Sequence, residues 1–119
     1  MKSMKFKCGA TIPVGTLVYK KVYEPSIYGR GQARVITCIV TKPGFCPNRK
    51  EGAGKSRVPE VLVISVTGKT KATTFISGWD TDFEYKLYEK RSTKFNKDKD
   101  QVCTDGIHVF LTKSAAQRY

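Results

Sequence analysis

Residues 60–77 read EVLVISVTGKTKATTFIS, and this stretch decides the fold class. Val, Ile, Thr and Phe dominate both of its halves, which is typical of β-strands. Gly68-Lys69 separates the halves, and two residues of this kind between apolar runs predict a tight β-hairpin. We therefore expect one strand over 60–67 and another over 70–77, joined by a two-residue turn.

The rest of the chain continues the strand pattern. Strand-like composition recurs over residues 16–23, 34–41, 83–88 and 106–111. In FEYKLY, strict alternation places Phe83, Tyr85 and Leu87 on one face of the strand. Between the strands, residues 24–33 and 42–59 are rich in Gly and Pro and are expected to be loops, the first exposed and mobile. Residues 90–100 mix charges of both signs and are expected to form a solvated surface segment.

The C-terminal end is the one convincing helix. Thr112 can cap the segment KSAAQRY, residues 113–119. Seven residues make a helix that is marginal alone, so it must pack against the sheet. We expect an α+β fold, a small sheet-rich single domain over 1–119 with six to seven short, mostly antiparallel strands and this helix. Residues 1–15 are expected to form a loosely ordered arm or an edge strand.

Composition limits the protein classes. The 119 residues contain 39% hydrophobic and 27% charged residues, which is ordinary for a globular protein. No window approaches the 18 apolar residues of a membrane span, and the N-terminus lacks the apolar stretch of a secretory signal. The four cysteines are therefore expected to be reduced thiols of an intracellular protein.

Charge is the strongest compositional signal. The chain has 22 Lys and Arg against 10 Asp and Glu, a formal net charge of +12. Residues 1–59 hold 12 of the basic residues and only two acidic ones, Glu24 and Glu51. Such a segment should present a positive face that attracts polyanions. The alternative is a generally basic surface without an anionic ligand.

Interleaved cations and aromatics are the candidates for binding an anion. The candidate phosphate-neutralising residues are Lys20, Lys21, Arg30, Arg34, Arg49, Lys50, Lys55 and Arg57. The candidate stacking residues are Tyr23 and Tyr28. Nucleic acid and a small phosphorylated nucleotide both remain as ligands. In the alternative reading, the tyrosines pack in the core and the lysines are only solvated.

Few features of the sequence indicate an enzyme or a metal site. EGAGKSR, residues 51–57, resembles a P-loop, but Arg49 stands where that motif requires glycine, and a strand follows instead of a helix. Cys103 and His108 are five apart, without the close spacing of zinc ligands, and no CxxC occurs. We expect no metal, no cofactor and no catalytic residue.

The C-terminal stretch resembles a domain of unknown function from phages and large DNA viruses, often attached to pentapeptide repeats. Its Cys-x-x-Gly-Ile-His-x-Phe-x-Thr motif is matched by Cys103, Gly106, Ile107, His108, Phe110 and Thr112, and the helix that follows by Ala116 and Tyr119. Weaker matches are Lys55, Arg57, Ser77, Trp79, Asp80, Phe83, Tyr85 and Lys86. The resemblance spans roughly residues 17–119 and implies a small α+β domain in a viral, intracellular setting, without implying a reaction.

A looser resemblance links DGIHVFLTKSAAQRY to the strand and helix of ADP-ribosyltransferases that help to hold NAD. In those enzymes a downstream strand brings a catalytic glutamate, and because the sequence ends at Tyr119 we expect no such strand here. We therefore expect a non-enzymatic viral accessory protein that binds an anionic partner, with a role in countering host defence. A protein-binding inhibitor, a virion component and a degenerate transferase are the alternatives.

Overall fold

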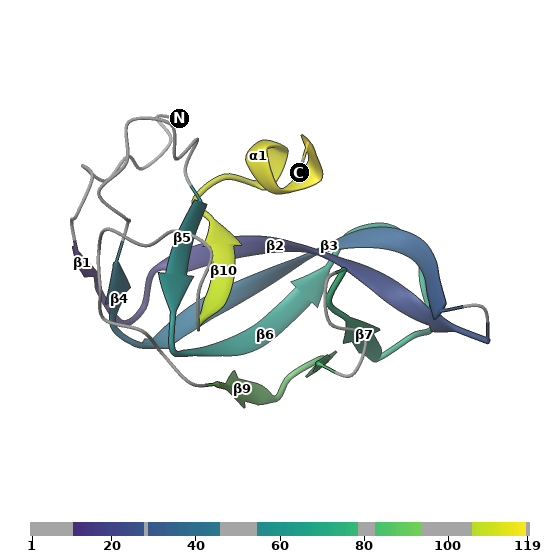
Figure 1. Ribbon diagram of the computed structural model, residues 1–119, viewed down its shortest axis with the longest axis horizontal. Helices are drawn as coiled ribbons and strands as arrows, with labels where there is room; N and C mark the ends of the chain where they lie inside the picture. The colour runs from purple at the N-terminus through teal and green to yellow at the C-terminus, as the bar shows by residue number, and fades with distance from the viewer. Residues whose placement is uncertain (1–10, 28, 46–54, 79–82, 94–105, 119) are drawn as a thin grey trace.

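The computed structural model describes residues 11–27, 29–45, 55–78, 83–93 and 106–118. Within these residues, a ten-stranded antiparallel sheet makes up most of the structure, and one short helix follows the last strand (Figure 1). The elements are β1 Thr11–Ile12, β2 Leu17–Ser26, β3 Gly29–Lys42, β4 Gly44–Phe45, β5 Lys55–Val58, β6 Glu60–Val66, β7 Thr74–Ile76, β8 Glu84–Lys86, β9 Lys90–Ser92, β10 Ile107–Phe110 and α1 Lys113–Arg118.

The prediction of an α+β fold with six to seven strands is wrong. The described residues form an all-β structure, because α1 has six residues, of which only Ala116 is buried. A single short helix of this kind cannot make a second layer. The missing strands come from segments that were expected to be loops: β4 and β5 lie within 42–59, and β9 lies within 90–100.

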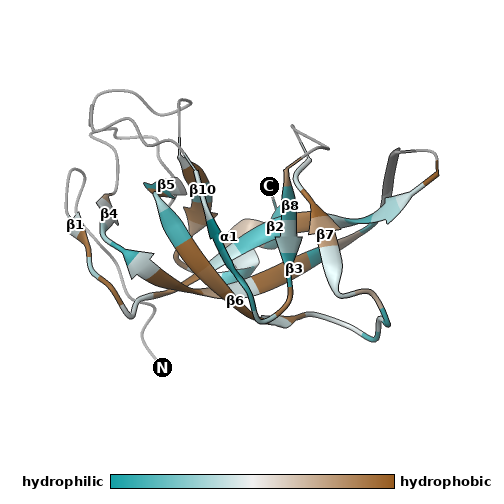
Figure 2. Ribbon diagram, turned by 90° about the horizontal axis from the view of Figure 1, so that it is seen from below, coloured by the Kyte–Doolittle hydropathy of each residue, from teal (hydrophilic) through white to brown (hydrophobic). Residues whose placement is uncertain are grey.

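The sheet is strongly curled. Its order is β1-β4-β5-β10-β2-β3-β6-β9, while β7 pairs with β2 and with β8. Figure 2 shows the two ends of the sheet rising on either side of β3 and β6. Register shifts between Thr37 and Cys38, and again between Val40 and Lys42, interrupt the β3–β6 ladder. Such bulges increase local bend and twist, which helps the sheet to close around a core.

The inner face of the curl holds the main hydrophobic core. Val, Ile and aromatic side chains from most strands pack together there. Figure 2 shows the hydrophobic stretches of β3, β6, β7 and β10 to which many of them belong. The fully enclosed members are Ile12, Val18, Val22, Ile36, Cys38, Val40, Val58, Val61, Val63, Phe75, Tyr85, Ile107 and Val109. A curled sheet can enclose this core without a second layer, because its own strands cover both sides.

The helix α1 packs on the outer face, above β2, β3 and β10 (Figure 1). Ala116 is buried there against Val35 of β3 and Phe110 of β10. The predicted cap is confirmed, because the Ala115 amide donates a hydrogen bond to Thr112 Oγ1 at 3.2 Å. A helix this short owes its stability to packing and capping more than to propensity.

The predicted hairpin between residues 60–67 and 70–77 is wrong. The chain does bend at Gly68, which has a φ of 75° that favours glycine. However, β6 pairs with β3 and β9, while β7 pairs with β2 and β8. A strand has only two edges, and both edges of β6 are already occupied. The chain therefore crosses from β6 to a different part of the sheet.

The predicted loop over residues 24–33 is also wrong in its described part. These residues continue β2 and β3 as a two-stranded ribbon, in which Pro25 pairs with Arg30 and Ser26 with Gly29. We call residues 24–27 and 29–33 the arm. It projects from the end of the molecule at the right of Figure 1.

Gly44 allows β4 to approach β5 closely, and we expect Gly44→Ala to destabilise the fold. A Cβ at this position would overlap Arg57 O and lie 2.6 Å from Val58 Cγ1. Because both atoms belong to a buried strand, overpacking should cost about 2 kcal/mol. Urea denaturation measures this cost, with Pro43→Ala, at an exposed neighbour, as the control. Equal midpoints for both variants would contradict the tight contact.

Candidate anion-binding face

The two adjacent lysines of β2 lie on opposite faces of the sheet, because successive strand side chains alternate. Lys20 points to the inner face, where its Nζ donates to His108 O at 2.8 Å and lies 5.9 Å from the ring centroid of Tyr85. Lys21 points to the outer face, where its Nζ donates to Gln117 O of α1 at 3.4 Å. Of the pair, Lys21 is the one positioned beside the helix.

Arg34 of β3 is fixed where the arm leaves the sheet. Its Nη2 lies 3.2 Å from Glu24 Oε2 and donates to Lys69 O at 3.2 Å. Thr70 Oγ1 donates to the other carboxylate oxygen of Glu24 at 2.5 Å. This hydrogen bond, together with Arg34, holds the pKa of Glu24 below its ordinary value although burial acts in the opposite direction. Glu24 is therefore ionised at neutral pH and keeps the guanidinium in place.

An open depression lies between α1, the base of the arm and the end of β6. Its volume is about 210 Å³, and its lining residues are Lys21, Ala33, Arg34, Val35, Thr67 and Gln117. Thr67 is held there by two hydrogen bonds with the Val35 backbone, both at 3.0 Å. Residues with cationic, hydroxyl and amide side chains thus border this depression, and groups of these kinds can bind phosphate oxygens.

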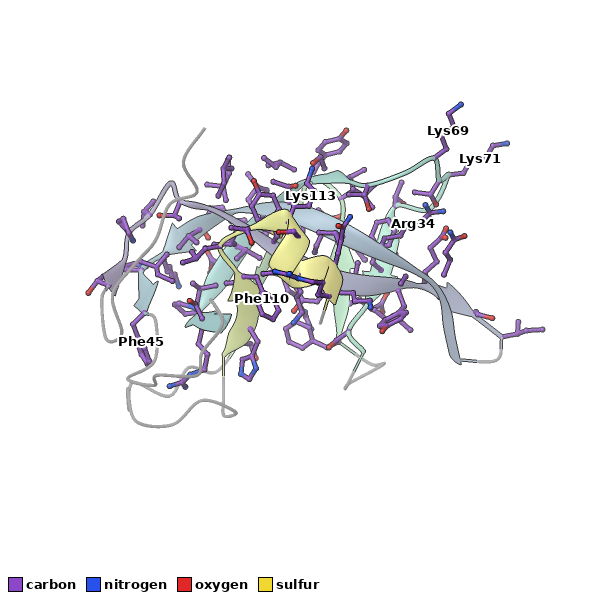
Figure 3. All side chains as sticks on the ribbon, turned by 90° about the horizontal axis from the view of Figure 1, so that it is seen from above. Arg34, Phe45, Lys69, Lys71, Phe110 and Lys113 are labelled. Atoms are coloured by element: carbon purple, nitrogen blue, oxygen red, sulfur yellow. The ribbon has the colours of Figure 1, made fainter. Side chains whose placement is uncertain are left out.

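Further basic side chains surround this depression. Lys69 and Lys71 are exposed on the connection between β6 and β7, and project outward near Arg34 in Figure 3. On the helix, Lys113 Nζ lies 5.9 Å from the Tyr19 ring centroid, and Arg118 is exposed in the last turn. We call this surface the basic face, and its residues are Lys21, Arg34, Lys69, Lys71, Lys113 and Arg118.

The structure brings together only part of the set proposed from the sequence. Lys21 and Arg34 meet at the depression, and Tyr23 is half-buried two residues along β2 from Lys21. Lys20 faces inward. Arg57 is 0% exposed, with its guanidinium carbon 4.7 Å from the ring centroid of Phe45, so it does not lie on the basic face.

The other proposed residues cannot be assigned to this face. Arg30 lies in β3 and Lys55 in β5, and their side chains are outside the description. Arg49, Lys50 and Tyr28 lie outside the described residues.

Four members of the basic face were missed by the sequence analysis: Lys69, Lys71, Lys113 and Arg118. They belong to the second half of the chain, whose net charge is much lower than that of the first half. Two local features of the sequence could have indicated these residues. GKTK, residues 68–71, places two lysines at a predicted turn, and the short capped helix has Lys113 at its start and Arg118 near its end. Their convergence with β2 and β3 depends on the crossover after β6, which has no sequence signature.

The inner face offers little chemistry among the described residues. Burial raises the pKa of the Cys38 thiol to about 12, so the thiol is protonated and a poor nucleophile at neutral pH. In this part of the chain, no three His, Cys, Asp or Glu side chains are grouped as metal ligands would be. No described helix is long and apolar enough to cross a membrane.

Substitutions at Lys20 and Lys21 should separate stability from binding. Lys20→Met loses a charge-assisted hydrogen bond to His108 O and should cost about 1–2 kcal/mol of unfolding free energy. Lys21→Met should change stability by less than about 0.5 kcal/mol, because its contact is exposed, yet should weaken anion binding. Urea denaturation and anisotropy of a labelled oligonucleotide report the two properties. If Lys20→Met weakened binding and Lys21→Met lowered stability, the assignment of Lys20 to the inner face and Lys21 to the outer face would be contradicted.

Comparison with known proteins places the chain among relatives of unassigned role. A family model described as a family of unknown function, DUF5758, matches residues 4–116. No curated protein and no solved structure matches the chain significantly.

Proposed function

The chain belongs to the DUF5758 family of unknown function, and from that premise we propose that it is a non-enzymatic nucleic-acid-binding protein that uses the basic face. Its C-terminal motif resembles a domain of phages and large DNA viruses. The proposal therefore extends to an accessory protein that acts in the host cytoplasm of an infected cell and counters host defence.

The observation that carries the proposal is the convergence of cations from four separate segments. β2, β3, the β6–β7 connection and α1 each contribute to the basic face. Glu24 is the acidic side chain within this surface, and it is engaged by Arg34 and Thr70. The six basic residues, with Glu24 already engaged, give this surface a positive charge, which favours a polyanion as its ligand.

The shape of the site favours nucleic acid over a small nucleotide. A pocket for a small molecule encloses most of its ligand. Here the depression is open, and the remaining cations lie outside it on the turn and on the helix. Cations spread over a surface suit successive phosphates of a polymer, each of which needs only one or two contacts.

The test is the salt dependence of binding to labelled single-stranded and double-stranded DNA. If four to six phosphates are neutralised, the slope of log K against log salt should be about −3 to −5. Absence of binding at about 50 mM salt, or binding that salt does not weaken, would contradict the proposal. Incubation with labelled NAD tests the alternative that the protein is an enzyme. We expect that the NAD is not consumed and that its label is not transferred.

A further inference from the structure

The arm extends the β2–β3 hairpin beyond the rest of the sheet (Figure 1). Tyr23 pairs with Ile76 of β7, and Ile36 pairs with Val66 of β6. Beyond these positions, the described backbone of the arm pairs in ladders only with itself. A two-stranded ribbon has little core of its own, so an arm that projects in this way gains from contact with a partner.

A bulge bends the arm at its base. Glu24 lies opposite both Gly31 and Gln32, because the register shifts between Tyr23 and Pro25. A Cβ at Gly31 would lie 2.7 Å from Glu24 O, so the close approach requires glycine. Bulges re-aim the residues beyond them, and this one sets the direction of the tip.

The tip carries an exposed aliphatic side chain. Ile27 directly follows β2 and is 91% exposed, more than any other large hydrophobic residue in the described part of the chain. A single exposed apolar side chain is ordinary on a protein surface. At the end of a projecting ribbon, however, it is placed to meet a partner.

The surroundings of the arm indicate what that partner is. Arg34 lies at its base, beside the exposed Lys69 and Lys71 (Figure 3). A hydrophobic tip above a cationic base complements a ligand that has apolar groups inside and anionic groups at the rim. Pro25 lacks an amide hydrogen, which makes the arm a poorer template for an added β-strand.

We propose that the arm enters the major groove of a DNA duplex, with Ile27 against the base edges and the basic face on the flanking phosphates. This inference rests on the proposed function and names its ligand. The exposed methyl group of thymine in the major groove is the apolar partner that suits Ile27.

The dimensions of the arm agree with this placement. Residues 24–27 extend about 13 Å at roughly 3.3 Å per residue, which exceeds the major-groove depth of about 8.5 Å. Two strands about 4.8 Å apart, with their side chains, fit a groove about 12 Å wide. The minor groove, about 6 Å wide, would have to open to admit the ribbon.

The experiment compares two duplexes that differ only in the thymine methyl groups. One contains thymine and the other contains deoxyuridine at the same positions, and binding is measured by anisotropy. The native chain should bind the thymine duplex about fourfold more tightly, the scale of burying one methyl group. Ile27→Ser should remove this preference, so that the variant binds the two duplexes with equal affinity.

Two controls define the site further. Val14→Ser replaces another exposed apolar side chain, near β1, and should keep the full preference for thymine. Methyl green, which occupies the major groove, should displace the protein, whereas the minor-groove ligand netropsin should not. Because Ile27 is exposed, the urea midpoint of Ile27→Ser should equal that of the native chain.

The outcomes distinguish this inference from the function on which it rests. Failure to bind any DNA would overturn both. Salt-dependent binding with equal affinity for the two duplexes would overturn the inference alone. So would a preference for single strands, displacement by netropsin, or an Ile27→Ser variant that keeps the preference for thymine.

Discussion

Reversing two charges on the β6–β7 connection, in Lys69→Glu with Lys71→Glu, is expected to weaken DNA binding by about tenfold to a hundredfold at moderate salt. Both lysines are exposed and stand beside Arg34, so each can neutralise a phosphate. The substitution removes two attractions and adds two repulsions. It should also make the slope of log K against log salt shallower by about two, because each lost phosphate contact contributes about one.

A matched control exists in the same chain. Lys86 of β8 and Lys90 of β9 are exposed lysines on strands away from α1, near the lower edge of Figure 1. Lys86→Glu with Lys90→Glu changes the net charge equally, so any effect of overall charge appears in both variants. The basic face is the binding site only if the first pair loses much more affinity than the second. Equal losses would mean that binding follows net charge alone.

The largest effect on stability is expected for Arg57→Ala, at about 3 kcal/mol or more. Arg57 is fully buried in β5, where it pairs across the sheet with Phe45 of β4 and His108 of β10. Its guanidinium carbon lies 4.7 Å from the Phe45 ring centroid. Truncation removes this cation–π contact and leaves a cavity in a region where three strands meet.

Urea denaturation measures this loss, and Arg91→Ala is the matched control. Arg91 also stacks on an aromatic ring, with its guanidinium carbon 3.9 Å from the centroid of Phe83, but it is half-buried on the edge strand β9. We expect the control to cost about 1 kcal/mol. Arg57→Lys should be intermediate, because lysine keeps the charge but not the planar stacking surface. A cost for Arg57→Ala no larger than that of Arg91→Ala would contradict the structural role.

The buried position of Arg57 also affects how binding should be tested. A charge reversal there would place a carboxylate in the interior and report unfolding instead of lost affinity. Lys69 and Lys71 are better probes, because their side chains are exposed and their removal leaves the core intact.

Several local features were predictable because neighbouring residues determine them. In 83–88, Tyr85 is buried and Phe83 and Leu87 are half-buried, while the residues between them are exposed, as strict alternation predicts. The helix after Thr112 and its cap depend on contacts within one turn. The chain also bends at Gly68 after β6, although not in the predicted two-residue hairpin turn. Each of these follows from chain geometry over a few residues.

Long-range pairing was not predictable in the same way. The stretch 60–77 contains two strands and a turn, yet its strands do not pair with each other, because β3 and β9 occupy both edges of β6. The arm was expected to be a loop because Gly and Pro usually interrupt strands. A bulge accommodates Gly31 there, and Pro25 remains within the ribbon.

At the candidate site, too, local features were predictable and long-range contacts were not. The sequence by itself determined that the chain is basic, rich in short strands and closed by a capped helix, because composition and periodicity are local properties. The sequence analysis proposed both Lys20 and Lys21 as phosphate-neutralising residues, whereas adjacent strand residues alternate and the two lysines lie on opposite faces. Only the tertiary structure decided which of the two faces meets the helix. It also carried Lys69, Lys71 and Lys113 to that face and buried Arg57, because strands distant in sequence pair wherever edges and apolar faces are jointly satisfied.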